Sequence, residues 1–532
     1  MEKVFWKVFE KRSLLCFFVL IFLLFVSILR ITVINAENYR EVQANMGSKK
    51  IKIQNQRGTI FDCNGYPLTN NKKKIIACIS PTPRAITAIS TVLKGDALDA
   101  VLDTLQSGNP AVCEVPKIIE CDGIICTEIY TDDNYIPAIH TIGYNDNQNT
   151  GVSGIQKAYN SFLTVDTPLS VRFACDGKGG ILAGISPEIE NKASPLTFGI
   201  VTTIDITVQN VVESYASFLG EGAIIVASAK NSKIRGIASY PTFTTDNIEN
   251  LLSDDKTPLY NRTLGSYNVG SVFKPCVAAA GIENNFENYK YTCKGSFKII
   301  DRIFKCHEAK GHGFTDLKHA IAHSCNTYFY NLGIRVEKQG ILNMASNLNF
   351  GKAIRLCDNI LTSKGSLPNT EKLDNTAHLA NFSIGQGDFT ASPISLLPLY
   401  CAIASGGKYY MPSLIEGQTQ NGCFTSYDYG SPTKVFSEKT ANMLKDALSL
   451  VISEGTGTKA NPKTVTAAGK TATAQTGKYK NGKEIKSSWF CGFFPRENPQ
   501  YVVIVFCEDT TEQTKSSAEI FAEIADKINS LE

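Results

Sequence analysis

The features that this sequence lacks exclude several classes of protein. The net charge is only +3 over 532 residues, and no arginine-rich run or basic stripe is present, which argues against nucleic acid as a partner. Charged residues make up 19% and hydrophobic residues 43%, which excludes a disordered chain. No internal repeat or low-complexity tract is visible. The length exceeds that of one ordinary domain and predicts two or three.

Long apolar runs are also scarce, and only residues 14–34 are long and apolar enough to cross a bilayer. Four basic residues precede this run: Lys3, Lys7, Lys11 and Arg12. The positive-inside rule therefore predicts a cytoplasmic tail at residues 1–13 and an extracytoplasmic body. No small-x-small cleavage site follows, which favours a retained anchor over a cleaved signal peptide. We expect a single-pass protein of the cell membrane.

The 16 cysteines are scattered along the chain. An exported protein ordinarily pairs its cysteines as disulfides. Cys401 and Cys507, however, lie in strongly apolar runs, where a free cysteine acts as a small hydrophobic residue. We predict that most of the cysteines are reduced core residues.

The chain changes character near residue 203. Residues 36–202 mix short strand-like and helix-like pieces, including a turn signal at Asn64-Gly65 and a loop that becomes helical within residues 140–163. They supply no obvious set of catalytic side chains. Residues 203–532 predict helices and strands in two groups, with a long, mostly helical insert between them. The expected helices are 206–219 and 518–531, and the expected strands are 222–228, 233–239, 464–476, 487–494 and 501–508. This order is typical of an α+β domain with an antiparallel sheet.

The first motif with chemical meaning is GSVFKP, which contains Ser271 and Lys274. Positions i and i+3 share one helix face, so the amine can reach the hydroxyl. Serine needs an adjacent base, and lysine becomes one when burial lowers its pKa. Alone, Ser271 is better explained as a helix cap. The same S-x-x-K spacing occurs in three loop-like places: Ser253/Lys256, Ser405/Lys408 and Ser431/Lys434.

Two further motifs follow in order. HSCNTYF contains Ser324 and Asn326, although S-x-N spacing is common and also occurs at Ser107/Asn109 and Ser266/Asn268. GKTATAQTG contains Lys470, Thr471 and Thr473 on a predicted strand, where a cation beside hydroxyl groups suits a substrate carboxylate. Taken singly, each motif is better explained by a turn, a cap or an edge strand.

Together, the three motifs resemble the S-x-x-K, S-x-N, K-T-G arrangement of penicillin-binding proteins and serine β-lactamases. The chain resembles a class B penicillin-binding protein, the monofunctional transpeptidase of peptidoglycan synthesis, over nearly its whole length. RGTIFDCNG resembles part of that family's pedestal, and SIGQGDFTASP and SSWFCGFFP resemble landmarks of its catalytic domain. The resemblance implies an anchor at 14–34, an elongated pedestal at 36–202 and a transpeptidase domain, with a serine β-lactamase-like five-stranded antiparallel sheet, at 203–532.

The resemblance also implies a reaction, in which a D-Ala-D-Ala stem peptide acylates Ser271 and β-lactams inhibit covalently. The implied roles are as follows: Lys274 is the base, Ser324 and Lys470 transfer protons, Asn326 contacts a substrate amide, and Thr471 and Thr473 bind the terminal carboxylate. The backbone N–H groups of Ser271 and Thr473 would form the oxyanion hole. Ala472 departs from the family, which usually has glycine there, and this puts the fit of bulky β-lactams in doubt.

Other functions stay open at this point. A serine β-lactamase or β-lactam sensor shares the motifs but needs no pedestal, and a non-catalytic scaffold of cell division or elongation would not need the reactive residues. A glycosyltransferase activity lacks a carboxylate-rich site in residues 36–200. The resemblance implies no cofactor for the chemistry, and it suggests a multi-spanning membrane glycosyltransferase as partner.

Four residues between and within the first two motifs form a candidate metal site: Cys293, Cys306, His312 and Cys325. Three thiolates and one imidazole suit tetrahedral structural zinc, although no C-x₂-C pair is present. Some members of the resembling family carry zinc near this motif. His307 is an alternative nitrogen ligand. A Cys293–Cys306 disulfide and four unrelated residues are the competing interpretations.

Overall fold

The computed structural model describes residues 14–15, 17–33, 47–480 and 482–531. Its internal contacts divide the chain into two compact units. Unit 2 contains Arg57–Lys72, Thr131–Val165 and the residues from Ser194 onward, and unit 1 contains the other described residues. The predicted boundary at residue 203 falls inside unit 2, because β8 (Gly199–Thr202) pairs there with β2 (Thr59–Phe61).

Near the N-terminus, residues 17–33 are helical, and their large apolar side chains are exposed. Among the described residues, no helix combines the length and the apolar character that crossing a membrane requires. Cys16 and Ile34 of the predicted anchor, and all of the predicted cytoplasmic tail, lie outside the described residues.

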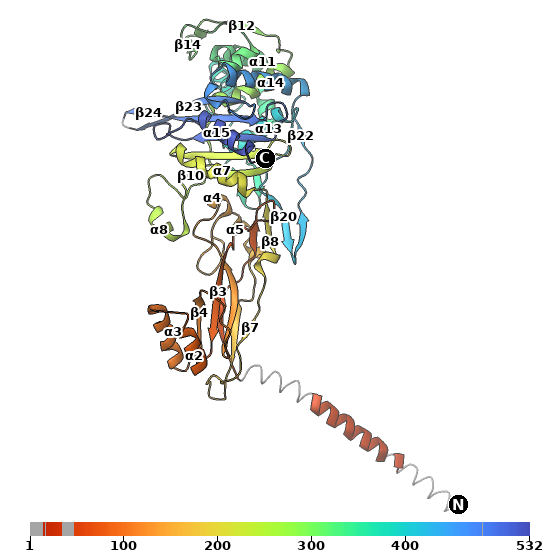
Figure 1. Cartoon of the computed structure of the whole chain (residues 1–532). Coiled ribbons are helices and arrows are strands. Elements are labelled where there is room, and N and C mark those ends of the chain that lie inside the picture. The colour runs from red at the N-terminus through yellow and green to blue at the C-terminus, as the bar shows by residue number, and fades with distance from the viewer. Residues whose placement is uncertain (1–13, 16, 34–46, 481, 532) are drawn as a thin grey trace, which may run out of the picture. The chain divides into compact units, whose positions relative to one another are not determined.

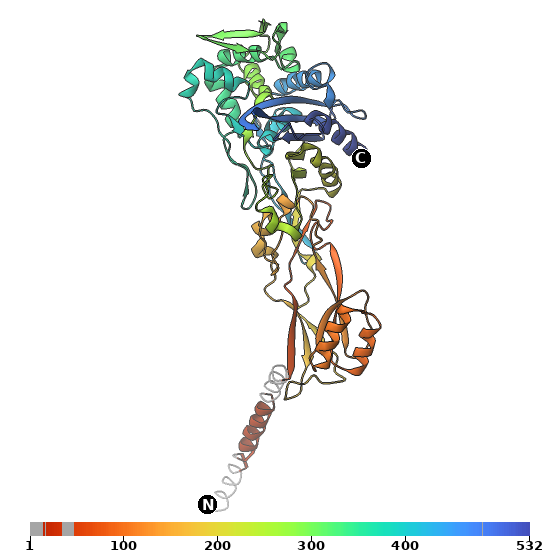
Figure 2. The same cartoon turned by 90° about the vertical axis from the view of Figure 1, so that its left-hand side faces the viewer.

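Beyond the helix of residues 17–33, Figure 2 shows that unit 1 contains two small sheets and the helices α2 (Pro83–Ser90) and α3 (Asp96–Gln106). One sheet consists of β3 (Lys72–Ile79), β4 (Ala111–Val115) and β5 (Ile124–Thr131), and the other of β1 (Ser48–Gln54), β6 (Leu169–Ala174) and β7 (Glu188–Glu190). Side chains alternate along β3: Ala77 and Ile79 pack with α2 and α3, and Ile76 and Cys78 pack with β6. Because successive side chains of a strand point to opposite faces of the sheet, this unit has two thin apolar layers, one on each side of β3.

The core of unit 2 is a five-stranded antiparallel sheet with the strand order β10-β9-β25-β24-β23 (Figure 1). Its strands are β9 (Gly222–Ser228), β10 (Ile234–Tyr240), β23 (Ala468–Lys480), β24 (Lys483–Phe494) and β25 (Tyr501–Cys507). β9 and β25 are buried on both faces, which is why each is an unbroken apolar run. β23 forms one edge of the sheet. The predicted α+β fold with an antiparallel five-stranded sheet is confirmed.

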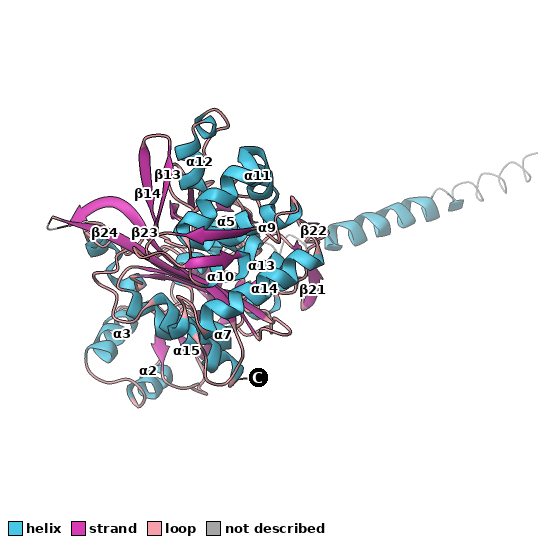
Figure 3. Ribbon diagram, turned by 90° about the horizontal axis from the view of Figure 1, so that it is seen from above, coloured by secondary structure: helices cyan, strands magenta, loops and turns pink. Residues whose placement is uncertain are grey.

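Helices cover both faces of this sheet (Figure 3). On one face, α7 (Ile206–Ala216) and α15 (Ser517–Asn529) pack against β9 and β25 through residues such as Val212, Phe521 and Ile224. The opposite face carries the mostly helical insert, as predicted. Its main helices are α9 (Lys274–Glu283), α10 (Leu317–Ala322), α11 (Asn326–Asn347), α12 (Thr376–Ser383), α13 (Leu397–Ala404) and α14 (Glu438–Ser453).

Shorter elements complete unit 2. The predicted helical end of residues 140–163 is present as α5 (Gly154–Ala158) and α6 (Asn160–Leu163), preceded by α4 (Ile139–Ile142). A small sheet joins β2 and β8 to β20 (Ile415–Gln420) and β21 (Cys423–Ser426). Two hairpin-like pairs lie between the first and second motifs: β12 (Lys290–Cys293) with β15 (Gly313–Asp316), and β13 (Ser296–Ile299) with β14 (Arg302–Lys305). All 15 described cysteines are free thiols, and nine of them are buried.

Candidate active site

Ser271 lies on a short 3-10 turn, Gly270–Phe273, that continues directly into α9. Gly270 has φ +66°, and a β-carbon there would lie 3.3 Å from the methyl group of Ala474 and 3.5 Å from that of Ala472. Only glycine adopts this backbone conformation without strain while leaving room for both methyl groups. The turn therefore brings Ser271 close to strand β23.

Lys274 is completely buried. Its Nζ contacts three oxygen atoms of the second motif: the Ser324 carbonyl at 2.7 Å, the Ser324 hydroxyl at 3.0 Å and Asn326 Oδ1 at 2.7 Å. Burial lowers the pKa of Lys274 to about 7. Among the described residues, no hydrogen bond joins Lys274 to the Ser271 hydroxyl, and such contacts often tighten only when substrate binds.

The second motif forms the connection between α10 and α11. Ser324 has φ +53°, a left-handed conformation that is uncommon for serine and that persists only where neighbouring contacts hold it. Lys274 provides two of these contacts. The next residue but one, Asn326, is the first residue of α11. The Ser324 hydroxyl both donates and accepts, so it is suited to pass a proton to or from the lysine.

The third motif lies on the edge strand β23. Burial alternates along the strand, with Thr471 and Thr473 partly or fully exposed and Lys470 fully buried. The buried amine of Lys470 still lies 3.4 Å from the Thr471 hydroxyl. Lys470 Nζ donates to the Thr471 carbonyl oxygen at 3.0 Å. Burial lowers the pKa of Lys470 well below its ordinary value, and the charge of Lys274 lowers it further. The two buried amines thus oppose each other's protonation.

Residues from all three motifs line one cleft of about 650 Å³: Ser271, Ser324, Asn326, Thr471, Ala472 and Thr473. Lys274 and Lys470 are buried and have no exposed surface. The structure therefore brings the seven predicted catalytic and substrate-binding residues together around one cleft, although the three motifs are far apart in the sequence. A nucleophile, two amines of lowered pKa and a row of hydroxyl groups are the parts that serine acyl transfer requires.

Residues 222–526 match the penicillin-binding protein transpeptidase domain family, and this range is more than half of the chain. The protein belongs to this family. Its chemistry is that of a serine acyltransferase, which needs no cofactor. The departure at Ala472 is accommodated structurally, because its methyl group faces the side-chain-free Gly270.

Curated relatives of this transpeptidase-domain protein align over much of its length. "Stage V sporulation protein D" of Bacillus subtilis is 26% identical over 86% of this chain and 75% of its own. "Peptidoglycan D,D-transpeptidase MrdA" of Haemophilus influenzae is 24% identical over 72% of this chain and 63% of its own.

Solved structures share the fold. Penicillin-binding protein 2 from Helicobacter pylori has a TM-score of 0.66 at 22% identity, covering 91% of this chain and 99% of that one. A D,D-transpeptidase domain from Eggerthella lenta has a TM-score of 0.64 at 23% identity, covering 90% of this chain and 100% of that one.

The cleft also contains two residues that the sequence did not indicate, Thr456 and Lys459, and it contains His307, which the sequence indicated only as an alternative metal ligand. Thr456 follows α14, and its hydroxyl lies 2.9 Å from the Thr471 hydroxyl and 3.4 Å from Lys470 Nζ. Its backbone N–H donates to the Ala322 carbonyl at 3.1 Å. Thr456 therefore ties the third motif to the end of α10. No local pattern marks it, because its partners lie in other segments.

Replacing Thr456 by valine should slow acylation of the protein by penicillin about five- to tenfold. The change keeps the shape of the side chain and removes the hydroxyl contacts with Thr471 and Lys470, whose combined net contribution is about 1 kcal/mol. Stopped-flow or gel-based labelling rates measure the effect. The matched control is Thr458→Val, because Thr458 is exposed and does not line the cleft. Equal rates for wild type and Thr456→Val would show that Thr456 does not position the third motif.

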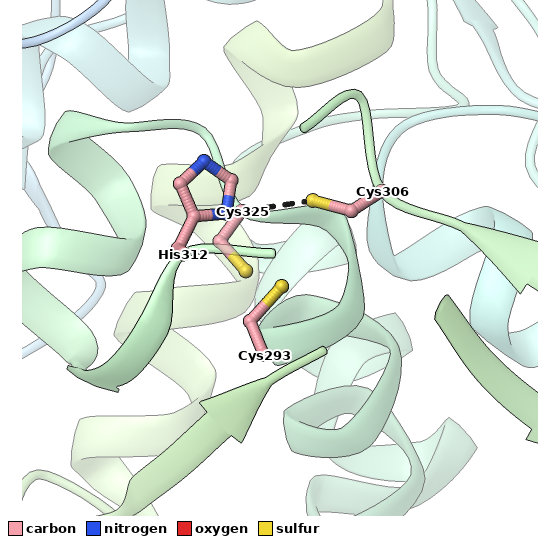
Figure 4. A group of neighbouring side chains, drawn as sticks. All are labelled: Cys293, Cys306, His312 and Cys325. Atoms are coloured by element: carbon pink, nitrogen blue, oxygen red, sulfur yellow. Dashed lines mark hydrogen bonds between the residues drawn. The ribbon is translucent and has the colours of Figure 1, made fainter. Parts of the chain in front are cut away.

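The four predicted metal ligands also come together (Figure 4). Cys293 ends β12, Cys306 follows β14, His312 precedes β15, and Cys325 stands between Ser324 and Asn326. One ligand atom from each lies within 4.8 Å of all the others. Tetrahedral zinc with bonds of about 2.3 Å to sulfur would hold its sulfur ligands about 3.8 Å apart, so only a small contraction is needed.

Further contacts favour His312 over His307 as the nitrogen ligand. His312 Nδ1 lies 3.6 Å from Cys306 Sγ, whereas His307 Nδ1 lies 3.9 Å from it, and His307 lines the catalytic cleft. Hydrogen bonding with Cys325 lowers the pKa of the Cys306 thiol, and a thiolate is the form that binds metal. Cys293 and Cys306 are free thiols in this structure, not a disulfide.

Proposed function

We propose that this protein is a peptidoglycan D,D-transpeptidase that cross-links stem peptides through an acyl-Ser271 intermediate and that β-lactams inhibit covalently. The observation that carries the proposal is the convergence of Ser271, Lys274, Ser324 and Lys470 at one cleft in a transpeptidase-family domain. Relatives that bear the name peptidoglycan D,D-transpeptidase support the substrate class.

In the proposed first half-reaction, neutral Lys274 takes the proton of Ser271, and the serine oxygen attacks the carbonyl carbon between the two D-alanines. The oxyanion receives hydrogen bonds from the backbone N–H groups of Ser271 and Thr473. The C–N bond then breaks, and the departing D-alanine amine takes a proton relayed through Ser324 or Lys470. Thr471 and Thr473 hold the terminal carboxylate of the donor, and Asn326 holds an amide of the donor peptide.

In the second half-reaction, the amine of a neighbouring stem peptide attacks the acyl-Ser271 ester. The new amide bond forms, the ester bond breaks, and the proton lost by the amine returns to Ser271 through Lys274. Because the same groups act in reverse order, no additional base is required.

The decisive experiment is labelling with fluorescent penicillin followed by peptide mapping, together with an assay for D-alanine release from a stem pentapeptide. We expect one lasting label on the peptide that contains Ser271, and D-alanine release that penicillin blocks. Rapid turnover of the label would instead indicate a β-lactamase. The absence of both label and D-alanine release would indicate a non-catalytic scaffold.

We further propose that Cys293, Cys306, His312 and Cys325 hold a structural zinc ion. The ion would join the segment between β12 and β15 to the loop of the second motif, because Cys325 lies between Ser324 and Asn326. This segment is otherwise rich in exposed lysine and glycine and buries little apolar surface of its own. A metal would therefore supply the stability that packing does not.

Zinc content tests this site independently of activity. Protein purified without chelator should contain about one zinc per chain by elemental analysis, since a structural site is nearly full. Cys306→Ser should lose most of this zinc and melt at a lower temperature, whereas Cys423→Ser, which changes an exposed cysteine elsewhere, should retain it. Less than about 0.2 zinc per chain in the wild type would exclude the site.

We also propose that residues 14–34 anchor the protein in the cell membrane, with the N-terminus in the cytoplasm and the body outside. The run of apolar side chains and the basic residues before it support this arrangement. The apolar side chains of residues 17–33 are exposed to solvent, which is unfavourable unless lipid covers them. In this proposal residues 36–202 are a non-catalytic pedestal and residues 203–532 the transpeptidase domain.

Removing the residues before about position 36 should release a soluble body that still reacts with penicillin. The full chain should instead fractionate with membranes and require detergent. Fractionation and labelling of both forms provide the test. An insoluble or unreactive truncated body would contradict a simple anchor.

A membrane partner follows from the same proposal. One structural neighbour, Helicobacter pylori penicillin-binding protein 2, was solved in complex with MreC. For this chain we propose a multi-spanning membrane glycosyltransferase, because cross-linking requires newly made glycan strands. Detergent co-purification of the full chain should recover such a partner, and recovery that is unchanged after removal of residues 14–34 would count against contact within the membrane.

A further inference from the structure

A second cavity in unit 2, of about 590 Å³, shares no lining residue with the catalytic cleft. Five segments contribute to it: the β9–β10 turn, the end of α13 with β19 (Lys408–Tyr409), β22 (Thr433–Lys434), one face of α14 and the loop between β24 and β25. Its volume is that of a small-molecule site. We call it the lysine cavity, after Lys230, Lys408, Lys434 and Lys445.

Each of these four lysines comes from a different segment. Among the residues that the structure describes, none of the four ammonium groups has an ion pair or a hydrogen bond. Of the described residues that line the cavity, two are carboxylates, Glu438 and Glu497, and Glu497 already accepts a hydrogen bond from Thr466. Four positive and two negative side chains leave the lining with a net charge of +2.

Two of the lysines are direct neighbours. β19 and β22 pair antiparallel, and Lys408 stands directly opposite Lys434. Like charges at directly opposed positions destabilise a strand pair, since their β-carbons are only about 5 Å apart. The fold thus holds two cations side by side, and the nearest carboxylates in electrostatic reach are Glu438 in the same lining and Glu283, which interacts with Lys434. A bound anion would remove this repulsion.

The α14 side of the cavity supplies both charge and hydrogen-bond donors. Glu438, Asn442 and Lys445 are spaced i, i+4 and i+7 and therefore share one helix face. Lys445 is half-buried, and this burial lowers its pKa, which Glu438 partly offsets. Desolvated cations interact more strongly with an anion than exposed ones do. The amide groups of Asn498 and Gln500 add neutral donors.

The cavity is built for binding and not for catalysis. Ser405, one of the S-x-x-K serines noted in the sequence, donates its hydroxyl hydrogen bond to the Ala229 carbonyl at 2.6 Å, so the hydroxyl is already engaged. No histidine or cysteine lines the cavity among the described residues.

We propose that the lysine cavity binds a ligand with two or more oxyanion groups, either carboxylates or phosphates. The chemistry shared by both is a small polyanion whose oxyanion groups contact several of the four lysines at once. The proposal rests on the lining and on the Lys408–Lys434 pair, and it does not depend on the proposed transpeptidase reaction.

Calorimetric titration of the full chain in detergent with tricarballylate and, separately, with tripolyphosphate tests the proposal. We expect saturable binding at one site with a Kd below about 1 mM for at least one probe. Lys408→Gln/Lys434→Gln should weaken that binding at least tenfold. Without probe, this double variant should melt at a temperature equal to or above that of the wild type, because the repulsion between the two lysines is removed.

The matched control is Lys94→Gln/Lys117→Gln, which removes the same charge from exposed positions of unit 1 and should bind the probes as the wild type does. Penicillin labelling of all three proteins checks the catalytic cleft separately. A preference for tricarballylate would indicate a polycarboxylate ligand, and a preference for tripolyphosphate a polyphosphate ligand. Absence of saturable binding to either probe, or an equal loss in both double variants, would overturn the proposal.

Discussion

In the Ser271→Ala variant, covalent labelling by fluorescent penicillin is expected to disappear entirely. Ser271 provides the only oxygen that the mechanism acylates. The variant should fold normally, because the half-buried hydroxyl has no hydrogen bond within the described structure and its removal leaves only a small gap. Gel fluorescence measures the label, and thermal melting checks the fold.

The other S-x-x-K serines provide matched controls for this result. Ser253 and Ser431 are exposed, and Ser253→Ala and Ser431→Ala should each be labelled at the wild-type rate. Labelling of Ser271→Ala at the wild-type rate would mean that another residue is the nucleophile. Loss of label in Ser253→Ala or Ser431→Ala would point to that residue.

The Lys274→Arg variant should be acylated at least about a hundredfold more slowly, the usual scale for loss of a general base. Arginine keeps the positive charge but does not deprotonate in a protein. Lys256→Arg, at an exposed ion pair with Glu512, is the control and should leave the rate unchanged. A loss of tenfold or less in Lys274→Arg would mean that another group is the base.

The same lysine predicts a pH dependence. Burial lowers the pKa of Lys274 to about 7, and only the neutral amine accepts a proton. Acylation by penicillin should therefore be slow below pH 6, rise through pH 7 and level off above pH 8. A rate that is flat between pH 6 and 8 in the wild type would contradict the assignment.

Sequence patterns predicted the strand boundaries well where burial alone determines where a strand begins and ends. β9 coincides with the predicted residues 222–228, and β25 ends one residue before the predicted end. The strand predicted at 464–476 starts four residues too early. Thr464 donates its backbone N–H and its hydroxyl to Asp526 of α15, at 2.7 and 2.8 Å, so it is fixed by a helix and not by the sheet.

The motif residues could be predicted because each motif lies within a short stretch of sequence. Their contacts could not be predicted, because they join segments that are far apart in the sequence. Lys274 was expected to contact Ser271, three residues away, and instead contacts Ser324 and Asn326, about 50 residues away. Thr456 gave no signal at all, because its role depends on Thr471 in another segment. Distances between segments depend on packing, which a single sequence does not reveal.

The position of β23 at the edge of the sheet affects how the enzyme selects the peptide bond that it attacks. An edge strand offers its free backbone groups to any extended peptide, whatever its side chains. Such pairing fixes direction, but a slip of one residue would invert every side chain and move a different carbonyl over Ser271. In the proposed mechanism, the hydroxyl groups of Thr471 and Thr473 bind the terminal carboxylate and so fix the end of the peptide. The distance along the peptide from this carboxylate then determines which peptide bond lies at Ser271. A peptide extended by one residue would place the wrong bond there.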